Sequence, residues 1–151
     1  MGDMLASGEL AAAIGIEANA PEVKPLIPDA LEAGLAALRR RGHYPINHLV
    51  VIKDELIAKH PDLAADVFDA FAHAKCRYVE DLKAGEIEQP SEVDEVHRRV
   101  MEITGEPLPY GIAPNRKVIA ELIRHALTQG IITKPVTVDE LFAPSMRTLV
   151  G

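Results

Sequence analysis

The sequence predicts an α/β fold that is rich in helices and has few strands. Two short apolar runs, at residues 10–16 and 45–52, have the composition of strands buried in a sheet. About five or six other segments repeat apolar residues at helical spacing. Of the 151 residues, 48% are hydrophobic, but three are Phe, three are Tyr and none is Trp, so we expect an aliphatic core.

The two strand candidates leave open which sheet they belong to. The first run follows a helical turn that Gly8 closes, and the second begins at Pro45 and becomes β-branched toward Ile52. A stable sheet usually needs three or more strands. Either the two runs pair within a small mixed sheet, or the remaining strands lie in a part of the protein outside these residues.

Three helices are expected in the first half of the chain. One spans residues 29–41 and ends near Gly42, and a short one spans residues 53–59. A longer helix opens at Pro61, because proline suits the first position of a helix. The side chains expected to form its buried stripe are Leu63, Val67, Ala70, Phe71, Ala74, Tyr78 and Leu82.

Further helices are predicted in the second half from their N-terminal signals. Ser91 and Asp94 have the spacing of a capping box, and so have Thr137 and Glu140. Another helix is expected to begin at Pro114. The loop before Pro114 should have a fixed shape, since two prolines restrict its backbone.

Composition and charge argue against several classes of function. The formal net charge of −7 at pH 7 does not suit a nucleic-acid surface or attraction to anionic lipid. No apolar run reaches about 18 residues and no signal peptide is visible, so we expect a cytoplasmic protein without a membrane anchor. The single cysteine, Cys76, rules out an internal disulfide and a Cys-based structural zinc site.

Six histidines are present, but their spacing does not predict a metal site. No pair has the i, i+4 spacing of two ligands on one helix. Two of them, His43 and His48, lie at the second strand candidate. The others are interpreted as surface or capping residues: His60, His73, His97 and His125.

Three sets of segments resemble one enzyme family. They are residues 5–15, residues 44–52 with the helix after Pro61, and residues 108–117 with 141–144. In order and content they resemble the C-terminal half of 4,5-dihydroxyphthalate decarboxylases, enzymes of aromatic degradation that have a type-II periplasmic-binding-protein-like fold. The first segment is shared by many binding proteins of that fold. The motifs Tyr-Pro-Ile-Asn-His and Leu-Pro-Tyr-Gly-Ile-Ala-Pro-Asn-Arg are narrower.

The resemblance implies a protein of two α/β lobes around a ligand cleft. Residues 1–42 would form part of the second lobe and the crossover, and residues 43–151 the C-terminal part of the first lobe. The N-terminal half of the family fold is missing from these residues. We therefore expect that the chain alone lacks decarboxylase activity, and that it associates with the missing half or forms a homo-oligomer.

The reaction implied by the resemblance converts 4,5-dihydroxyphthalate, or a related aromatic dicarboxylate, to protocatechuate and carbon dioxide. It needs a proton donor at the ring carbon that loses its carboxylate. His48, which would share a strand face with Ile46 and Val50, is predicted to be this catalytic group; the alternative is a hydrogen-bonded core histidine. No cofactor motif is evident, so a cofactor-independent carboxy-lyase is expected.

Substrate-binding residues are predicted around His48 and in the second motif. They are Tyr44, Asn47 and His43 near the strand, and Tyr110 and Arg116 further along the chain. At the start of a helix, free backbone N–H groups and the Arg116 guanidinium could bind a carboxylate, the alternative being a solvated charge. Two other functions stay open: a small-anion-binding protein of a nitrate/taurine-type transporter, and an inactive fragment.

Overall fold

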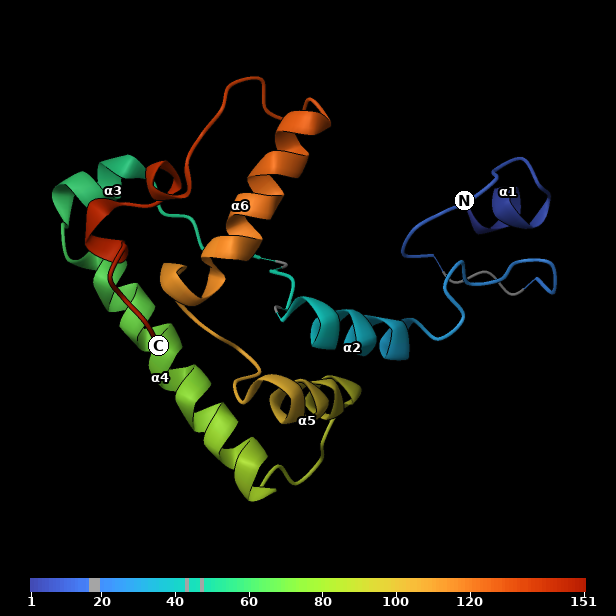
Figure 1. Cartoon of the computed structure of the whole chain (residues 1–151), viewed down its shortest axis with the longest axis horizontal. Helices are drawn as coiled ribbons and strands as arrows, with labels where there is room; N and C mark the ends of the chain where they lie inside the picture. Colours follow the sequence, from blue (N-terminus) through green and yellow to red (C-terminus); the bar gives the residue numbers. More distant parts are fainter. Residues whose placement is uncertain (17–19, 43, 47) are drawn as a thin grey trace. The chain divides into compact units, whose positions relative to one another are not determined.

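The computed structural model describes residues 1–16, 20–42, 44–46 and 48–151. The described residues divide into two units, Met1–Ala36 and Ala37–Gly151, with the boundary inside a helix. They form six α-helices and two 3₁₀ helices (Figure 1): α1 (Gly2–Ala6), α2 (Ala30–Arg41), α3 (Asp54–Lys59), α4 (Leu63–Ala84), α5 (Glu92–Thr104), α6 (Ile112–Thr128), η1 (Val138–Leu141) and η2 (Pro144–Met146). None of these described helices is both long enough and apolar enough to cross a membrane.

The prediction of an α/β fold is wrong, because the described part of the chain contains no β-strand. Residues 10–16 and the described residues of 45–52 lie in irregular backbone. Ile14 is 99% exposed and Val51 is 89% exposed, so neither run is buried as a sheet strand would be. An apolar, β-branched segment becomes a strand where neighbouring strands bond its backbone and cover its side chains. Within the described residues, these two runs have no such neighbours.

The helix ends agree with the glycine and proline signals of the sequence. Gly8 has a φ of 78° just after α1, and Gly42 has a φ of 73° just after α2. The Gly42 N–H donates to the Leu38 carbonyl at 2.7 Å, which closes the last turn of α2. The helices predicted over residues 29–41 and 53–59 are therefore confirmed as α2 and α3.

α4 is a 22-residue helix that begins two residues after Pro61. Its buried residues are Ala64, Lys75, Val79 and Leu82. The stripe predicted for this helix is only partly correct, since Leu82 is buried but Phe71 is 50% exposed. The observed buried face of α4 includes Lys75. The long aliphatic stem of a lysine can lie on an apolar surface while its ammonium group binds a polar partner.

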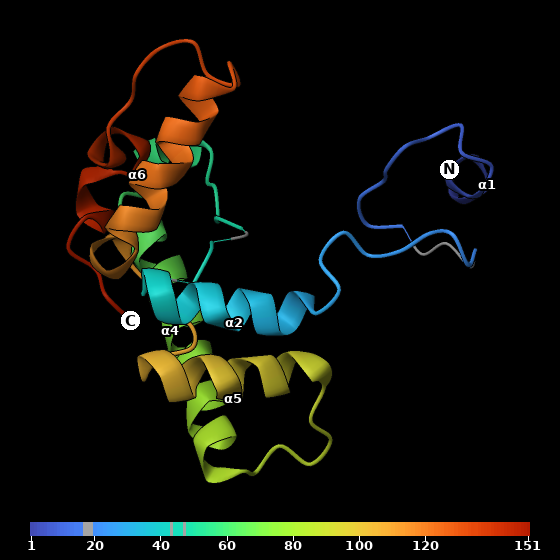
Figure 2. The same ribbon diagram turned by 45° about the vertical axis from the view of Figure 1, so that its right-hand side comes forward.

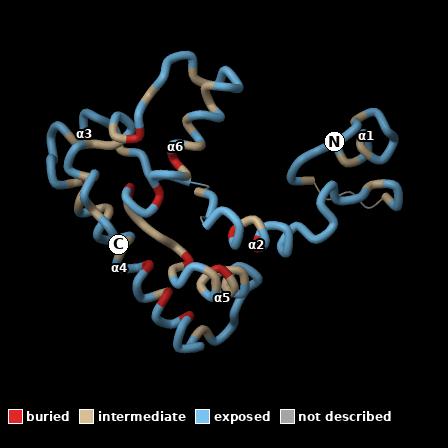
Figure 3. Tube along the Cα trace, viewed as in Figure 1, coloured by how far each residue is buried: buried red, intermediate tan, exposed pale blue. Residues whose placement is uncertain are grey.

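α5 packs against α4 in the second unit, and the two helices are adjacent in both ribbon views (Figures 1 and 2). The capping box predicted at Ser91 is confirmed, with the Ser91 hydroxyl accepting from the Asp94 N–H. Val100 is fully buried, at 0% exposure. Figure 3 shows buried residues on both helices, whereas most residues of the second unit are exposed or half-buried.

α6 begins at Ile112, two residues earlier than predicted, and places Pro114 inside its first turn. Proline is tolerated there because the first N–H groups of a helix have no partner within it. Ile112, Ile119 and Val138 form a buried cluster, and the partly buried side chains packed on it are Ile46, Ile123 and Phe142. The predicted capping box of Thr137 and Glu140 is confirmed, and it opens η1.

The last residues of the chain close over the loop before α6. Tyr110 and Gly151 exchange two backbone hydrogen bonds, of 3.2 and 3.4 Å, beside an antiparallel bridge between Gly111 and Val150. Gly111 has a φ of 99°, and a Cβ built on it would overlap the Leu149 carbonyl oxygen. Glycine is required at this position by both the backbone conformation and the close approach of the chain end.

Candidate functional site

The loop that carries the second motif has a well-defined shape. Pro107 is buried, and the Asn115 side-chain amide donates to the Pro109 carbonyl at 2.7 Å and to the Gly111 carbonyl at 2.8 Å. Asn115 is itself 8% exposed, so its two bonds compensate for burial of the amide. The loop that carries Tyr110 is therefore fixed by hydrogen bonds from Asn115 of α6 and from Gly151.

A buried cation contacts Tyr110. Lys75 of α4 is 6% exposed, and its Nζ lies 3.4 Å from Glu106 Oε2 and 5.8 Å from the centroid of the Tyr110 ring. The Glu106 Oε1 atom also accepts from the Leu108 N–H at 3.0 Å. An ammonium group taken out of water needs an anion or an aromatic face, and Lys75 has both. Tyr110 is thus in contact with a positive charge that is already paired.

The described residues of the first motif are mostly exposed, apart from Ile46. Tyr44 is 37% exposed and His48 is exposed, while His43 and Asn47 fall outside the described residues. Ile46 packs on the buried cluster that contains Ile112. Residue Ile46 of the first motif and residue Ile112 of the second therefore belong to one apolar cluster, together with Ile119 and Val138.

Arg116 is not at the helix start where it was predicted to bind an anion. Because α6 begins at Ile112, Arg116 lies in the second turn. It forms a two-bond ion pair with Asp139, with Nη2–Oδ1 at 2.7 Å and Nη1–Oδ2 at 3.3 Å. These bonds raise the pKa of Arg116 and lower the pKa of Asp139. The guanidinium does hold a carboxylate in this structure, but the carboxylate belongs to the protein.

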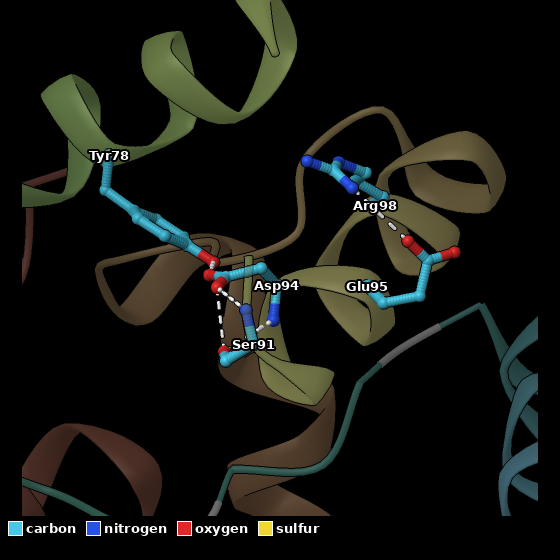
Figure 4. Close-up of polar contacts among 5 residues, drawn as sticks. All are labelled: Tyr78, Ser91, Asp94, Glu95 and Arg98. Atoms are coloured by element: carbon cyan, nitrogen blue, oxygen red, sulfur yellow. Dashed lines mark hydrogen bonds and ion pairs between the residues drawn. The ribbon is translucent and has the colours of Figure 1, made fainter. Parts of the chain in front are cut away.

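A polar cluster that sequence reasoning missed joins α4 to α5. The Tyr78 hydroxyl lies 2.6 Å from Asp94 Oδ1 and 2.8 Å from His97 Nδ1. Figure 4 shows the Tyr78 side chain reaching from α4 to the start of α5, where Asp94 also binds Ser91. The rings of Tyr78 and His97 meet edge to face, with centroids 5.7 Å apart and planes at 79°. We call Tyr78, Asp94 and His97 the α4–α5 cluster.

The protonation states of the α4–α5 cluster follow from its geometry. Burial, followed by the hydrogen bond to Asp94, raises the pKa of Tyr78 to about 12. The bonds from Tyr78 and Ser91 lower the pKa of Asp94 to about 2. Burial lowers the pKa of His97, against the attraction of Asp94. At neutral pH the cluster therefore holds a neutral phenol, a carboxylate and a neutral imidazole.

Two sequence signals pointed toward this cluster without identifying it. The sequence predicts Tyr78 in the buried stripe of its helix and Asp94 in a capping box. The interpretation of His97 as a surface or capping residue is corrected, because it is half-buried against Tyr78. The i, i+3 spacing of Asp94 and His97 puts both on one face of α5, but nothing local shows which helix meets that face.

The two hollows in the described part of the chain lie away from the described residues of the predicted site. A hollow of about 390 Å³ is lined by residues 131–134 and Val136, and one of about 1030 Å³ in the first unit is lined by residues 5–8, 10–13, 16 and 22–26. Neither is lined by Tyr44, His48 or Arg116. Within the described ranges, no three His, Cys, Asp or Glu side chains are grouped so that they could hold a metal ion.

No family model, no curated protein and no solved structure matches this chain.

Proposed function

We propose that this chain carries substrate-binding and proton-transfer residues of a decarboxylase that acts on 4,5-dihydroxyphthalate or a related aromatic dicarboxylate. The observation that supports the proposal is the packing of Ile46 on the cluster of Ile112, Ile119 and Val138, because one residue from each of the two motifs that resemble the decarboxylase family takes part in it. The proposal rests on these motifs and not on the fold class, which is helical in the described residues.

The chemistry replaces one ring carboxylate by hydrogen. A proton adds to the ring carbon that bears the carboxylate, while the hydroxyl para to that carbon donates electron density to the ring. The bond between the ring and the carboxylate then breaks, carbon dioxide leaves, and the electron pair of that bond restores the aromatic ring. Protocatechuate remains. The protein must supply one proton and hold the second carboxylate in place.

Each proposed role follows from the residue's chemistry and position. His48 is exposed two residues after Ile46, which packs on the buried cluster, and an imidazole is the side chain most often used as a general acid. Arg116 already holds the Asp139 carboxylate with two bonds, and a substrate carboxylate would bind in the same geometry after displacing it. Tyr44 and Tyr110 would donate hydroxyl hydrogen bonds to the oxygens of the substrate.

The experiment titrates the ¹⁵N-labelled chain with 4,5-dihydroxyphthalate and records amide and imidazole NMR signals. We expect the signals of His48, Tyr110 and Arg116 to move together. His48→Gln should remove the shifts near the ring, whereas His60→Gln, which changes an exposed histidine outside the proposed site, should leave them intact. Carbon dioxide is measured for this chain and for the chain joined to the N-terminal half of a family member.

Release of carbon dioxide by the joined protein, with a loss of about 10²-fold or more in His48→Gln, would support the proposal. Binding without carbon dioxide from either protein would favour the anion-binding alternative. Absence of shifts at millimolar dicarboxylate, together with absence of turnover, would show that the resemblance does not extend to function.

A further inference from the structure

The α4–α5 cluster fixes where its protons lie. Tyr78 has one hydroxyl proton, and the ionised Asp94 carboxylate at 2.6 Å accepts it. The Tyr78 oxygen can then only accept from His97 Nδ1, 2.8 Å away. His97 is thereby held as the Nδ1–H tautomer, and Nε2 is the atom that takes up a second proton in acid.

The cluster lies on the faces through which the two helices meet. On α4, Tyr78 shares its face with the buried Lys75 and Leu82, and on α5, His97 shares its face with the fully buried Val100. Tyr78 and His97 are half-buried. A charge formed on His97 would therefore lose part of its hydration without gaining a new partner from Tyr78.

The charged groups around His97 oppose this penalty only in part. Asp94, on the same helix, attracts an imidazolium, but its carboxylate already accepts from Tyr78 and Ser91. From α4, the facing group is the neutral phenol of Tyr78. Arg98 acts on Tyr78 and pairs with Glu95 at 3.3 Å. Burial outweighs the attraction of Asp94, so protonation of His97 is disfavoured in the packed state.

We propose that the α4–α5 cluster is an acid-sensitive latch, which holds the two helices together while His97 is neutral and loosens when His97 takes up a second ring proton. The sign follows from linkage: the unfolded or opened state binds more protons, so the closed state loses stability as pH falls. The loss begins near the ordinary histidine pKa of about 6.5 and continues through the lowered value of the packed state. Loosening would expose apolar side chains of both helices.

The test uses the whole chain and two NMR measurements. Imidazole ¹H–¹⁵N spectra at about pH 7.5 report the tautomer of His97. Hydrogen-exchange protection factors are then measured for α5 and α6 at about pH 7.5 and about pH 5. We expect the Nδ1–H tautomer, and a loss of roughly threefold or more in α5 protection at the lower pH, with a smaller change in α6.

Two variants separate the latch from general acid effects. His97→Gln keeps a hydrogen-bond donor but cannot be protonated, so its α5 protection should not change between the two pH values. His73→Gln is the matched control, because His73 is an exposed histidine whose Nδ1 bonds the Asp69 carbonyl of its own helix; it should keep the wild-type response. An Nε2–H tautomer, or wild-type α5 protection that is equal at both pH values, would overturn the proposal even if the variants fold poorly. A full response in His97→Gln would also overturn it.

Discussion

Asp94 binds Tyr78 with one carboxylate oxygen and caps its own helix with the other. Oδ1 accepts from the Tyr78 hydroxyl at 2.6 Å, while Oδ2 accepts from the Ser91 N–H and hydroxyl, both at 2.7 Å. The same side chain therefore begins α5 and docks that helix on α4. Local helix formation and tertiary packing depend on one ionised group.

We expect Tyr78→Phe to lower the free energy of unfolding by at least about 1 kcal/mol, because the ring stays but the hydrogen bonds with Asp94 and His97 are lost. Urea unfolding followed by circular dichroism measures the change. Tyr44→Phe is the matched control, since it removes a hydroxyl from a tyrosine that is 37% exposed. If Tyr78→Phe lowers the free energy of unfolding no more than Tyr44→Phe does, the hydrogen bonds of the Tyr78 hydroxyl add no stability.

Stability on the acid side should depend on Asp94. Its pKa is lowered from 3.8 to about 2 in the folded chain, so its contribution is complete above the unfolded value and is lost as pH falls toward about 2. Asp94→Asn should be less stable at neutral pH and should show a flatter decline between about pH 4 and 2. The urea midpoint measured over this range tests it, with Glu88→Gln as a control at an exposed carboxylate. A wild-type decline in Asp94→Asn would contradict the assignment.

Gly111→Ala should be more destabilising than Gly130→Ala. Both glycines have positive φ, of 71° at Gly130 and 99° at Gly111. An alanine at Gly130 bears a backbone penalty of about 1–2 kcal/mol, and one at Gly111, where ψ is 167°, bears about 1–3 kcal/mol because this region is almost restricted to glycine. A Cβ at Gly130 meets open space, whereas at Gly111 it overlaps the Leu149 carbonyl. We expect a further loss of at least about 1 kcal/mol at Gly111, measured by thermal unfolding. Similar melting temperatures for the two variants would show that residues 149–151 do not pack on the loop.

Asp139→Asn should strengthen binding of an aromatic dicarboxylate if Arg116 is its anchor. The substitution frees the guanidinium from its carboxylate partner. The gain in affinity should be about two- to fivefold, the range set by an exposed ion pair, and isothermal calorimetry measures it. Glu95→Gln, which frees Arg98 from a similar exposed pair, is the control and should change nothing. An unchanged or weaker affinity in Asp139→Asn would remove Arg116 from the proposed site.

Features set by neighbouring residues could be predicted from the sequence. The capping boxes at Ser91 and Thr137 are confirmed because they need only side chains three residues apart. The end of α2 at Gly42 is likewise predicted correctly, because it depends on one glycine and the last turn of the helix. The strand at residues 45–52 was wrong for the opposite reason. Its composition suits a strand, but a strand also depends on partners that no local pattern reveals.

The missed parts of the site are tertiary contacts. Tyr78 and His97 are 19 residues apart, and their contact depends on how two helices are rotated about their axes. The pairing of Arg116 with Asp139 likewise joins α6 to η1 over 23 residues. For Arg116 the error had a second source: the sequence predicts a helix start at Pro114, whereas α6 begins at Ile112 and moves the arginine away from the free N–H groups.

The bridge between Gly111 and Val150 joins residues about 40 positions apart, whereas Tyr78 and Asp94 are separated by 16. Closing the longer loop costs more chain entropy, so we expect the α4–α5 pair to form first during refolding. The same order holds on a ribosome, where synthesis proceeds from the N-terminus. A nascent chain that has emerged as far as Leu141 would already contain all three residues of the α4–α5 cluster, while Tyr110 would still lack the backbone groups of Gly151 that bond its loop.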